Sequence, residues 1–233
     1  MIAEYVFLSH PLSTDTPTPP AIPKIELSPF LSLERGDSAN VTLVKMATHT
    51  GTHVDVPSHV VPGGLTLSDF TVAELVFGRP VVIDLPLGDG VLVMPSHLEG
   101  VARGRSDADL VIFRFGYGKV RASDPRRFGA HCPGFGVESA EFLLEEFPRM
   151  RALGMDVPSL SCIKYLDTTM KAHDVLLGGM GRRFIVIEDM HLDQDLGGLE
   201  EVIIAPLWLR GSDGGPATIL GRRQRVSAGE GGA

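Results

Sequence analysis

The 233-residue sequence has little cysteine, little basic charge and no long apolar run. Its two cysteines, Cys132 and Cys162, form neither a CxxC motif nor a disulfide framework, so we expect both to be reduced and structural. The 21 lysines and arginines are outnumbered by 29 acidic residues, which leaves no basic footprint for nucleic acid or for an anionic membrane surface. The apolar run over residues 202–209 is far shorter than the roughly 20 residues that cross a bilayer.

The amino terminus also lacks the pattern of a secretory signal, because residues 1–10 carry Glu4 and no basic region followed by an apolar stretch. We therefore expect a soluble, cytoplasmic protein. A chain of this length suits one domain, since domains commonly run to about 50–250 residues. We expect this domain over residues 1–221, with a Pro-rich arm over residues 1–23 included, and a mobile tail over residues 222–233, where the apolar pattern is lost.

Short apolar runs alternate with helix-like segments along the chain. Each run is bounded by glycine, proline or charge, as buried strands are. The four runs are residues 81–85, 110–113, 184–187 and 202–205. Helices are predicted over residues 68–77 and over residues 137–147, which Pro148 stops, and strands that alternate with helices predict an α/β domain. The proline-rich stretch from Pro11 to Pro23 is predicted to be extended or irregular, as an arm or as a segment that covers the site.

The uneven distribution of the eight histidines is the first feature that composition does not explain. His49, His53 and His59 fall within eleven residues, and Asp55 lies among them. Glycine, threonine, valine and proline in this segment oppose a helix, and in an extended chain His53 and Asp55 point to the same side. Gly51 allows a kink that brings His49 round to join them.

Two neutral imidazoles and one carboxylate form an open site for a borderline divalent metal, with positions left for water. Zinc suits such ligands first, and manganese is the alternative. A polar surface loop is the other interpretation of this segment, but buried histidine and aspartate are costly without a metal or a partner, which favours the metal site. His59 lies close enough to serve the same reaction centre as a free base, since histidine exchanges protons near neutral pH.

Residues 49–59 read His-Thr-Gly-Thr-His-Val-Asp-Val-Pro-Ser-His. This string resembles the HxGTHxDxPxH signature of the cyclase family of metal-dependent hydrolases, which includes bacterial kynurenine formamidases and isatin hydrolases. The other segments that resemble the family are residues 7–12, 133–138, 153–159, 205–207 and 211–216, with the pair His173 and Glu188. The resemblance implies a single α/β domain with a mixed central β-sheet and packed helices, in the swivelling β/β/α arrangement of that family.

The resemblance also implies a site with two metal ions per subunit. His49, His53 and Asp55 would bind one ion, and Asp55, His173 and Glu188 would bind the second, with the two carboxylates as bridges. Bridging carboxylates hold two ions about 3.5–4 Å apart, and such a pair generates hydroxide and polarises a carbonyl. A homodimer or homotetramer is implied in the same way.

The expected reaction is hydrolysis of an amide, formamide or lactam in a small molecule. Metal-activated hydroxide would attack the carbonyl, and His59 would act as general acid and base and carry the proton to the leaving nitrogen. The resemblance implies an activity like that of an arylformamidase, and with it a possible place in tryptophan catabolism. A lactone hydrolase or polyketide cyclase and a non-catalytic metal-containing binding protein are the alternatives, although a free base beside the metal favours an enzyme.

The sequence departs from the family where an aromatic substrate contact is expected. Pro19 stands where kynurenine formamidases carry a tryptophan, and the single tryptophan here, Trp208, is expected in the core of the closing strand. Arg114, Lys119 and Arg121 present charge to an acidic substrate or, as we favour, to solvent. These departures leave the hydrolase class intact and weaken formylkynurenine as the substrate.

Overall fold

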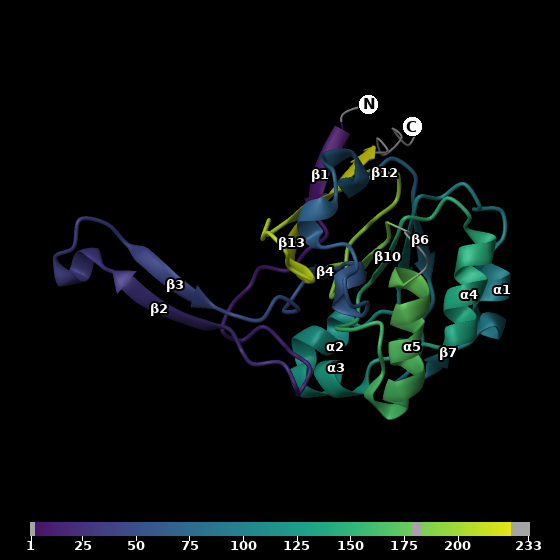
Figure 1. The fold of residues 1–233 in the computed structure, drawn as a ribbon, viewed down its shortest axis with the longest axis horizontal. Coiled ribbons are helices and arrows are strands. Elements are labelled where there is room, and N and C mark those ends of the chain that lie inside the picture. Colours follow the sequence, from purple (N-terminus) through teal and green to yellow (C-terminus); the bar gives the residue numbers. More distant parts are fainter. Residues whose placement is uncertain (1–2, 179–182, 225–233) are drawn as a thin grey trace, which may run out of the picture.

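A nine-stranded mixed sheet organises the chain in the computed structural model, which describes residues 3–178 and 183–224 (Figure 1). Its strands are β1 Ala3–Phe7, β4 His53–Asp55, β5 Val76–Phe77, β6 Pro80–Asp84, β8 Leu110–Arg114, β10 Ala152–Met155, β11 Ile185–Glu188, β12 Leu199–Pro206 and β13 Gly214–Gln224. Eight of them lie in the order β5, β12, β13, β4, β11, β10, β8, β6, and β1 pairs with the end of β13. Two small sheets pair β2 Glu26–Leu31 with β3 Val41–Lys45, and β7 Leu92–Val93 with β9 Gly134–Phe135.

The large sheet has a parallel half and an antiparallel half that meet at β4. Strands β6, β8, β10 and β11 run parallel to one another, as strands joined through helices do. Strand β4 pairs antiparallel with β11 on one side and with β13 on the other. The junction between the two halves therefore carries His53 and Asp55.

Among the residues that the structure describes, five α-helices and five short 3-10 turns accompany the strands. The helices are α1 Pro95–Ala102, α2 Gly118–Ser123, α3 Pro125–His131, α4 Val137–Glu146 and α5 Leu166–Leu177. The 3-10 turns are η1 Leu33–Arg35, η2 Pro57–His59, η3 Leu67–Asp69, η4 Val72–Leu75 and η5 Ile163–Tyr165. Helix α4 packs against both α1 and α5 beside the parallel half of the sheet (Figure 1). The predicted fold, one α/β domain with a mixed central sheet and packed helices, is confirmed.

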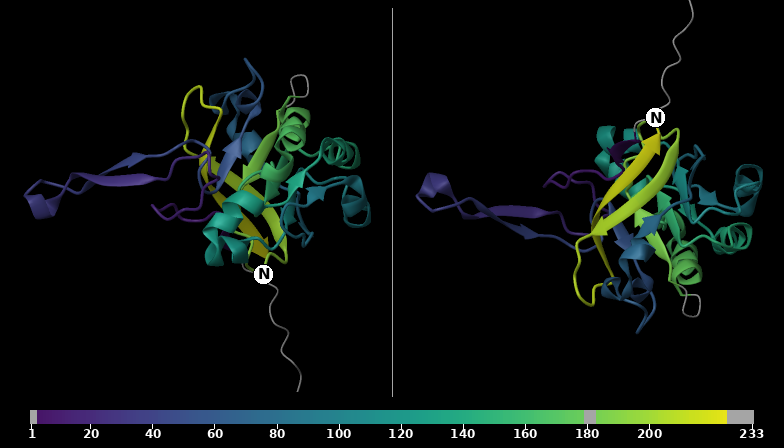
Figure 2. Two further views of the ribbon diagram at one scale, coloured as in Figure 1. Left: turned by 90° about the horizontal axis from the view of Figure 1, so that it is seen from below. Right: turned by 90° about the horizontal axis from the view of Figure 1, so that it is seen from above.

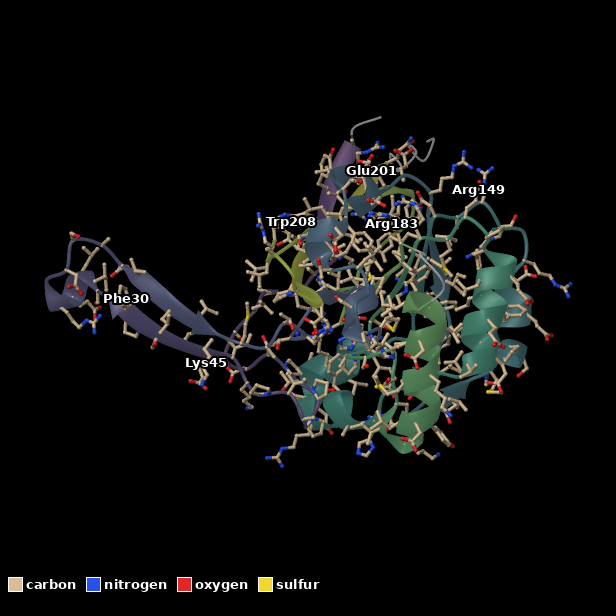
Figure 3. All side chains as sticks on the ribbon, in the orientation of Figure 1. Phe30, Lys45, Arg149, Arg183, Glu201 and Trp208 are labelled. Atoms are coloured by element: carbon tan, nitrogen blue, oxygen red, sulfur yellow. The ribbon has the colours of Figure 1, made fainter. Side chains whose placement is uncertain are left out.

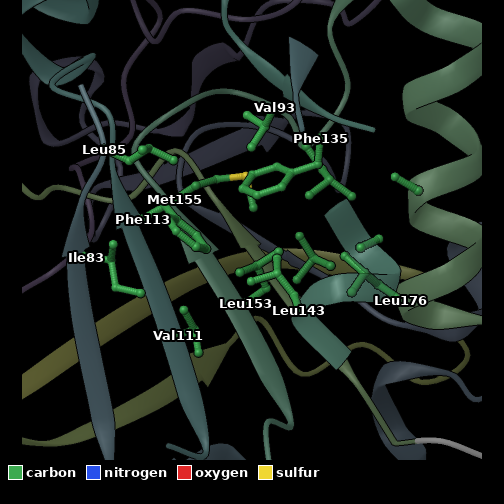
Figure 4. Close-up of a cluster of buried hydrophobic side chains, with 14 of the residues drawn as sticks. Ile83, Leu85, Val93, Val111, Phe113, Phe135, Leu143, Leu153, Met155 and Leu176 are labelled. Carbon is green, nitrogen blue, oxygen red and sulfur yellow. The ribbon is translucent and has the colours of Figure 1, made fainter. Parts of the chain in front are cut away.

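The apolar runs become strands that are buried on both faces. In β8, Val111 and Phe113 enter the core under the helices (Figure 4), whereas Leu110 and Ile112 enter a second core. Successive residues of a strand point to opposite faces, so a strand that is covered on both sides is apolar throughout. The four predicted strands are confirmed. Residues 81–85 largely form β6, residues 110–113 lie in β8, residues 184–187 largely form β11, and residues 202–205 lie in β12.

The helix predicted over residues 137–147 is confirmed as α4, and the helix predicted over residues 68–77 is wrong. The second segment forms η3 and η4 and then enters β5. Each of the two turns is closed by its own capping box, in which an acidic side chain accepts hydrogen bonds from the threonine that precedes the turn. Phe70 between the turns has an extended backbone, with ψ at 137°, and this ends the helical path.

Trp208 lies on the surface, so the expectation that it packs in the core is wrong. Its side chain stands in the loop between β12 and β13, where 51% of the residue is exposed (Figure 3). Strand β12 ends at Pro206, and the chain leaves the sheet before it reaches the tryptophan. The neighbouring Leu207 and Leu209 are exposed for the same reason.

Strands β2 and β3 form a hairpin that extends away from the rest of the molecule (Figures 1 and 2). At the other end of the chain, β13 extends to Gln224, so residues 222–224 of the predicted tail belong to the sheet. The remainder of that tail, residues 225–233, lies outside the described residues. Within the described ranges, no helix has the length and apolar character needed to span a membrane.

Candidate metal centre

A sharp bend before β4 turns His49 back toward the strand. Gly51 has a φ of +64°, a left-handed conformation that glycine adopts without steric cost. A Cβ atom at this position would also collide with the side chain of Leu12. The kink predicted at Gly51 is therefore present, and it places His49 beside His53 and Asp55.

The three side chains of this segment converge on one point. His49 Nδ1 lies 2.7 Å from Asp55 Oδ1, and His53 Nε2 lies 3.4 Å from the same oxygen. The rings of His49 and His53 meet edge to face, with centroids 5.2 Å apart. One candidate ligand atom from each of the three residues lies within 4.8 Å of the others, a spacing that suits the ligands of a single ion.

Strand β11 and helix α5 bring two further predicted residues to the same place. Glu188, the last residue of β11, pairs in register with His53, and its Oε2 lies 3.2 Å from His53 Nε2. Its Oε1 lies 3.5 Å from Nε2 of His173, which projects from α5. The same nitrogen of His173 lies 3.8 Å from Asp55 Oδ2. Asp55 and Glu188 therefore both lie between His53 and His173.

Backbone carbonyls orient two of the imidazoles. His53 Nδ1 donates to the carbonyl of Gly51 at 2.8 Å, and His173 Nδ1 lies 3.3 Å from the carbonyl oxygen of Thr169. A carbonyl accepts hydrogen bonds only, so Nδ1 of His53 carries the hydrogen in the neutral ring. The lone pair of Nε2 then points toward the carboxylates, which is how second-shell contacts prepare a metal-binding histidine.

The centre is buried and strongly charged. His53, Asp55, His173 and Glu188 are each no more than 3% exposed. Burial opposes the charged form of His53, but the carboxylates of Asp55 and Glu188 outweigh it and raise the pKa of His53 to about 9. Burial likewise opposes ionisation of Glu188, yet His173 and His53 hold the pKa of its carboxyl well below the ordinary value.

The donor set fits a divalent metal ion. His53 Nε2 is buried and makes no hydrogen bond, although it faces an oxygen of Asp55 and an oxygen of Glu188. A cation between these atoms satisfies the nitrogen and both carboxylates together, and imidazole nitrogen with carboxylate oxygen is a common ligand combination for zinc. The cluster therefore indicates a metal ion.

His59 stands at the edge of this cluster, and it has a partner that the sequence analysis missed. Its ring, at the end of η2, lies 4.0 Å from the ring of His49 and 5.9 Å from that of His173. Asp213, from the turn before β13, lies 2.8 Å from His49 Nε2 and 3.5 Å from His59 Nδ1 through the same oxygen. Partial burial of Asp213 opposes its ionisation, but the two histidines lower its pKa to about 2.

A cavity of about 410 Å³ opens onto the cluster. Its floor contains His49, His53, His59, His173 and Glu188, and the proline-rich segment forms one wall through residues 19–22. Apolar side chains from η5 and α5 form another wall, and among the described residues that line the cavity none is lysine or arginine. The predicted site-covering role of the proline-rich segment thus matches its position.

The other chemically reactive residues have structural partners. Arg114 pairs with Asp84 at 2.5 Å, and Arg121 forms a two-point ion pair with the buried Asp189 at 2.7 and 3.0 Å. Neither of these arginines lines the cavity. We favoured a solvent-exposed Arg121, but its side chain is mostly buried. Lys119 is exposed, as we favoured.

The cavity does contain one thiol, Cys132, whose Sγ donates to the carbonyl of Ser161 at 3.5 Å. Burial raises the pKa of this thiol, which keeps it protonated and a poor nucleophile. The adjacent His131 has an exposed side chain and does not line the cavity. The pair therefore does not form a thiol and base dyad.

Comparison with known proteins gives a consistent family. A family model described as putative cyclase matches residues 6–161. A kynurenine formamidase of Bacillus thuringiensis (strain Al Hakam) is 30% identical over 217 residues, which cover 92% of this chain and 95% of the relative. A kynurenine formamidase of Bacillus anthracis is 29% identical over the same length.

Solved structures show the same relationship. Isatin hydrolase A from Labrenzia aggregata, bound to benzyl benzoate, superposes with a TM-score of 0.79 at 26% identity, over 95% of this chain and 94% of that one. An isatin hydrolase bound to the product analogue thioisatinate has a TM-score of 0.77 at 22% identity, over 94% of this chain and 92% of that one. The second likeness concerns the fold alone.

Proposed function

Because the chain belongs to the cyclase family, we propose that it is a metal-dependent hydrolase that cleaves a non-peptide carbon–nitrogen bond in a small molecule. The observation that carries this proposal is the buried meeting of His53, Asp55, His173 and Glu188 at the floor of a cavity. The names of the relatives, kynurenine formamidase and isatin hydrolase, support an amide or lactam as the bond that is cleaved.

We assign the metal ligands as the family resemblance implies. His49, His53 and Asp55 would hold one ion, and Asp55, His173 and Glu188 would hold a second, with zinc preferred and manganese as the alternative. The position of both carboxylates between His53 and His173 supports their role as bridges. When bound, the metal would supply an activated water and polarise the carbonyl of the scissile bond.

His59 would hold and transfer the proton. Its side chain is 26% exposed at the cavity, so it reaches both a bound substrate and solvent. Asp213 beside its Nδ1 leaves Nε2 as the nitrogen that faces the substrate, and His59 would pass a proton to the leaving nitrogen as the carbon–nitrogen bond breaks. Asp213 would hold the rings of both His49 and His59 in place.

The cavity favours an uncharged, apolar substrate. Its walls include Pro19, Ile22, Ile163, Leu166 and Met170, and no described lining residue is a lysine or arginine that would pair with a substrate carboxylate. An aryl formamide or a lactam such as isatin therefore fits better than formylkynurenine, whose amino-acid group carries two charges. Pro19, in the place where the family leads one to expect tryptophan, forms part of this apolar wall.

Metal analysis combined with a substrate panel tests the proposed function. We expect the purified protein to retain metal and to hydrolyse aryl formamides and isatin, and we expect Asp55→Ala to lose both the metal and the activity. His131→Ala, which replaces an exposed histidine outside the cavity, is the matched control and should retain both. Bound metal without hydrolysis across amides, lactams and lactones would favour a binding protein, and full activity of metal-free Asp55→Ala would refute the mechanism.

A further inference from the structure

The turn immediately after Glu188 has an unusual backbone conformation. Asp189, the next residue, has a φ of +52°, and among the described residues it alone combines a positive φ with a side chain. A side chain in this left-handed region strains the backbone, and such strain persists only where the surrounding structure holds the residue in place, commonly beside functional groups. The contacts of Asp189 must therefore hold this turn.

Hydrogen bonds fix the backbone of Asp189 from two sides. Its amide donates to the carbonyl of Val157 at 2.7 Å, in the loop that follows β10, and its carbonyl accepts from the hydroxyl of Thr52 at 2.5 Å, directly before β4. The loop after β10 also donates to the metal-binding carboxylate, since the amide of Leu160 lies 2.5 Å from Glu188 Oε1. The position of Asp189 therefore determines how the end of β11 meets both β4 and this loop.

The side chain of Asp189 is buried against one arginine. Only 2% of this side chain is exposed, and Arg121 of α2 donates to its two oxygens through two nitrogens at 2.7 and 3.0 Å. His10 Nε2 lies 4.0 Å from the same carboxylate and makes no hydrogen bond. A planar two-point contact fixes the orientation of both groups, which the single ammonium of a lysine does not. Arg121 is thus the partner that orients Asp189.

Helix α2 provides a fixed base for this arginine. The carboxylate of Asp156 accepts hydrogen bonds at 2.8, 2.8 and 2.9 Å from the amides of residues 115–117, which directly precede α2. Asp156 is 1% exposed and directly follows β10, the neighbour of β11 in the sheet. The start of α2 is therefore tied to the end of one parallel strand, and Arg121 ties the helix to the end of the next.

We propose that the ion pair between Arg121 and Asp189 positions Glu188 for the metal. By fixing the turn after β11, the pair keeps the carboxylate of Glu188 between the two buried imidazoles that it faces. Neither residue of the pair lines the cavity, so both act through Glu188 and touch no substrate. This inference rests on the proposed function, in which Glu188 is a metal ligand.

A double variant separates positioning from the cost of an unpaired buried charge. Arg121→Met with Asp189→Asn removes both charges, and asparagine keeps the size of aspartate and tolerates a left-handed backbone. We expect this variant to fold and to bind zinc with a dissociation constant raised about 10–100-fold, as measured by chelator competition. The kcat for an aryl formamide should fall by a similar factor with KM unchanged, because the cavity walls are intact.

The ion pair between Arg151 and Asp109 provides the matched control. It also joins two partly buried side chains, at 3.3 Å, but these residues directly precede β10 and β8 and so lie at the opposite end of the parallel strands. We expect Arg151→Met with Asp109→Asn to lower thermal stability and to leave zinc affinity and kcat unchanged. Arg121→Lys, which keeps the charge but not the two-point contact, should lose less zinc affinity than the double variant at Arg121 and Asp189.

The cobalt-substituted protein gives a readout that a loss of stability alone does not change. Cobalt absorbs visible light at wavelengths set by the positions of its ligands, so we expect a changed spectrum for Arg121→Met with Asp189→Asn and the wild-type spectrum for the control pair. Wild-type zinc affinity and cobalt spectrum in the first variant, or equal losses in both pairs, would overturn the positioning role.

Two further outcomes are distinguishable from these. If the double variant does not fold, the same measurements on Arg121→Lys decide, and zinc affinity and a cobalt spectrum equal to those of the wild type would overturn the proposal. A wild-type chain that binds neither zinc nor cobalt would refute the proposed function itself, and the positioning role with it.

Discussion

The carboxylate of Asp55 contacts imidazoles from two distant parts of the chain. Its Oδ1 faces His49 and His53 within the same segment, and its Oδ2 faces His173 on α5. The side chain is 1% exposed, so water does not compensate its charge. A single buried carboxylate thereby links the strand junction to a helix, and both proposed metal sites depend on it.

Asp213→Asn tests whether the aspartate orients the two histidines. The amide retains the size of the side chain but loses the charge that His49 and His59 share, and loss of such an outer partner commonly costs about 10–100-fold in metal affinity or activity. We expect a decrease of that size in kcat, measured together with metal affinity by chelator competition. Asp107→Asn, at an exposed carboxylate paired with Arg79, is the control. Equal loss in both variants would show a general charge effect.

His10→Gln tests a buried histidine outside the catalytic cavity. Burial, together with the charges of Arg121 and His191, lowers the pKa of His10 to about 3. The unfolded chain takes up this proton near pH 6.5, so stability falls as the pH drops below that value. Between pH 6.5 and pH 5 the buried neutral histidine lowers the free energy of unfolding by about 2 kcal/mol. We expect urea unfolding to show a correspondingly weaker acid destabilisation in His10→Gln, and identical pH profiles would contradict it.

The sequence shows some site residues clearly and hides others for a physical reason. His49, His53 and Asp55 lie within one extended segment, where spacing and glycine placement predict which side chains meet. Asp213 is 154 residues from His59, and only the turn into β13 brings the two together. The sequence did contain one indication of Asp213, because this residue lies within the segment 211–216 that resembles the family. A single aspartate between a serine and a glycine, however, forms no local pattern that predicts a role in the site.

At the scale of elements, the bend before β4 determines whether His49 reaches the centre. Gly51→Ala adds a Cβ that meets Leu12 and forces a left-handed φ on alanine. Gly104→Ala has a similar φ of +77° but open space around it, so it isolates the backbone strain. We expect Gly51→Ala to lose at least about 1 kcal/mol more stability than Gly104→Ala, and to lose metal as well. Thermal unfolding and metal content measure these changes, and equal behaviour of both variants would disprove the role of the contact.

Prediction of the elements from sequence succeeds where burial is continuous. The run in β8 is apolar because both of its faces are covered, and such runs leave a clear pattern. Residues 68–77 have the composition of a helix, but side-chain hydrogen bonds to the backbone divide them into two turns. Strands β2 and β3 have no buried residue, so the usual alternation of buried and exposed positions does not identify them.

For the whole molecule, metal removal should lower stability, because the proposed ligands come from β4, α5 and β11 and a bound ion ties these elements together. A ligand at 100 times its dissociation constant stabilises the native state by about 2.7 kcal/mol. For a chain of this size that corresponds to roughly 5–10 °C in Tm. We expect a chelator to lower Tm by this amount and zinc or manganese to restore it, as measured by calorimetry.

Asp55→Ala serves as the control for this measurement and should show no response of Tm to either treatment. A chelator that leaves the wild-type Tm unchanged would contradict the role of the metal in stability. A variant that still responds to zinc would place the ion elsewhere in the molecule.

The overall fold class and the family could be predicted from sequence, and the order of strands could not. Residues 49–59 predict the cyclase family, and the family match confirms that prediction. The alternation of strands and helices predicts the α/β class, because each strand and helix forms its pattern locally. The neighbours of β4 depend on pairings across most of the chain, and local sequence carries no information about them.

The position of β4 at the centre of the sheet also determines when the sheet can finish folding during synthesis of the chain. Its residues leave the ribosome early, but Asp55 pairs with Val186 on one side and with Gly214 on the other. The strands that pair with β4 are therefore synthesised only late in translation, and His53 and Asp55 stay without these neighbours until then. A product truncated before β13 would leave the backbone edge of β4 unpaired and open to other chains, so chaperone binding to such nascent chains should persist until the last strand is released.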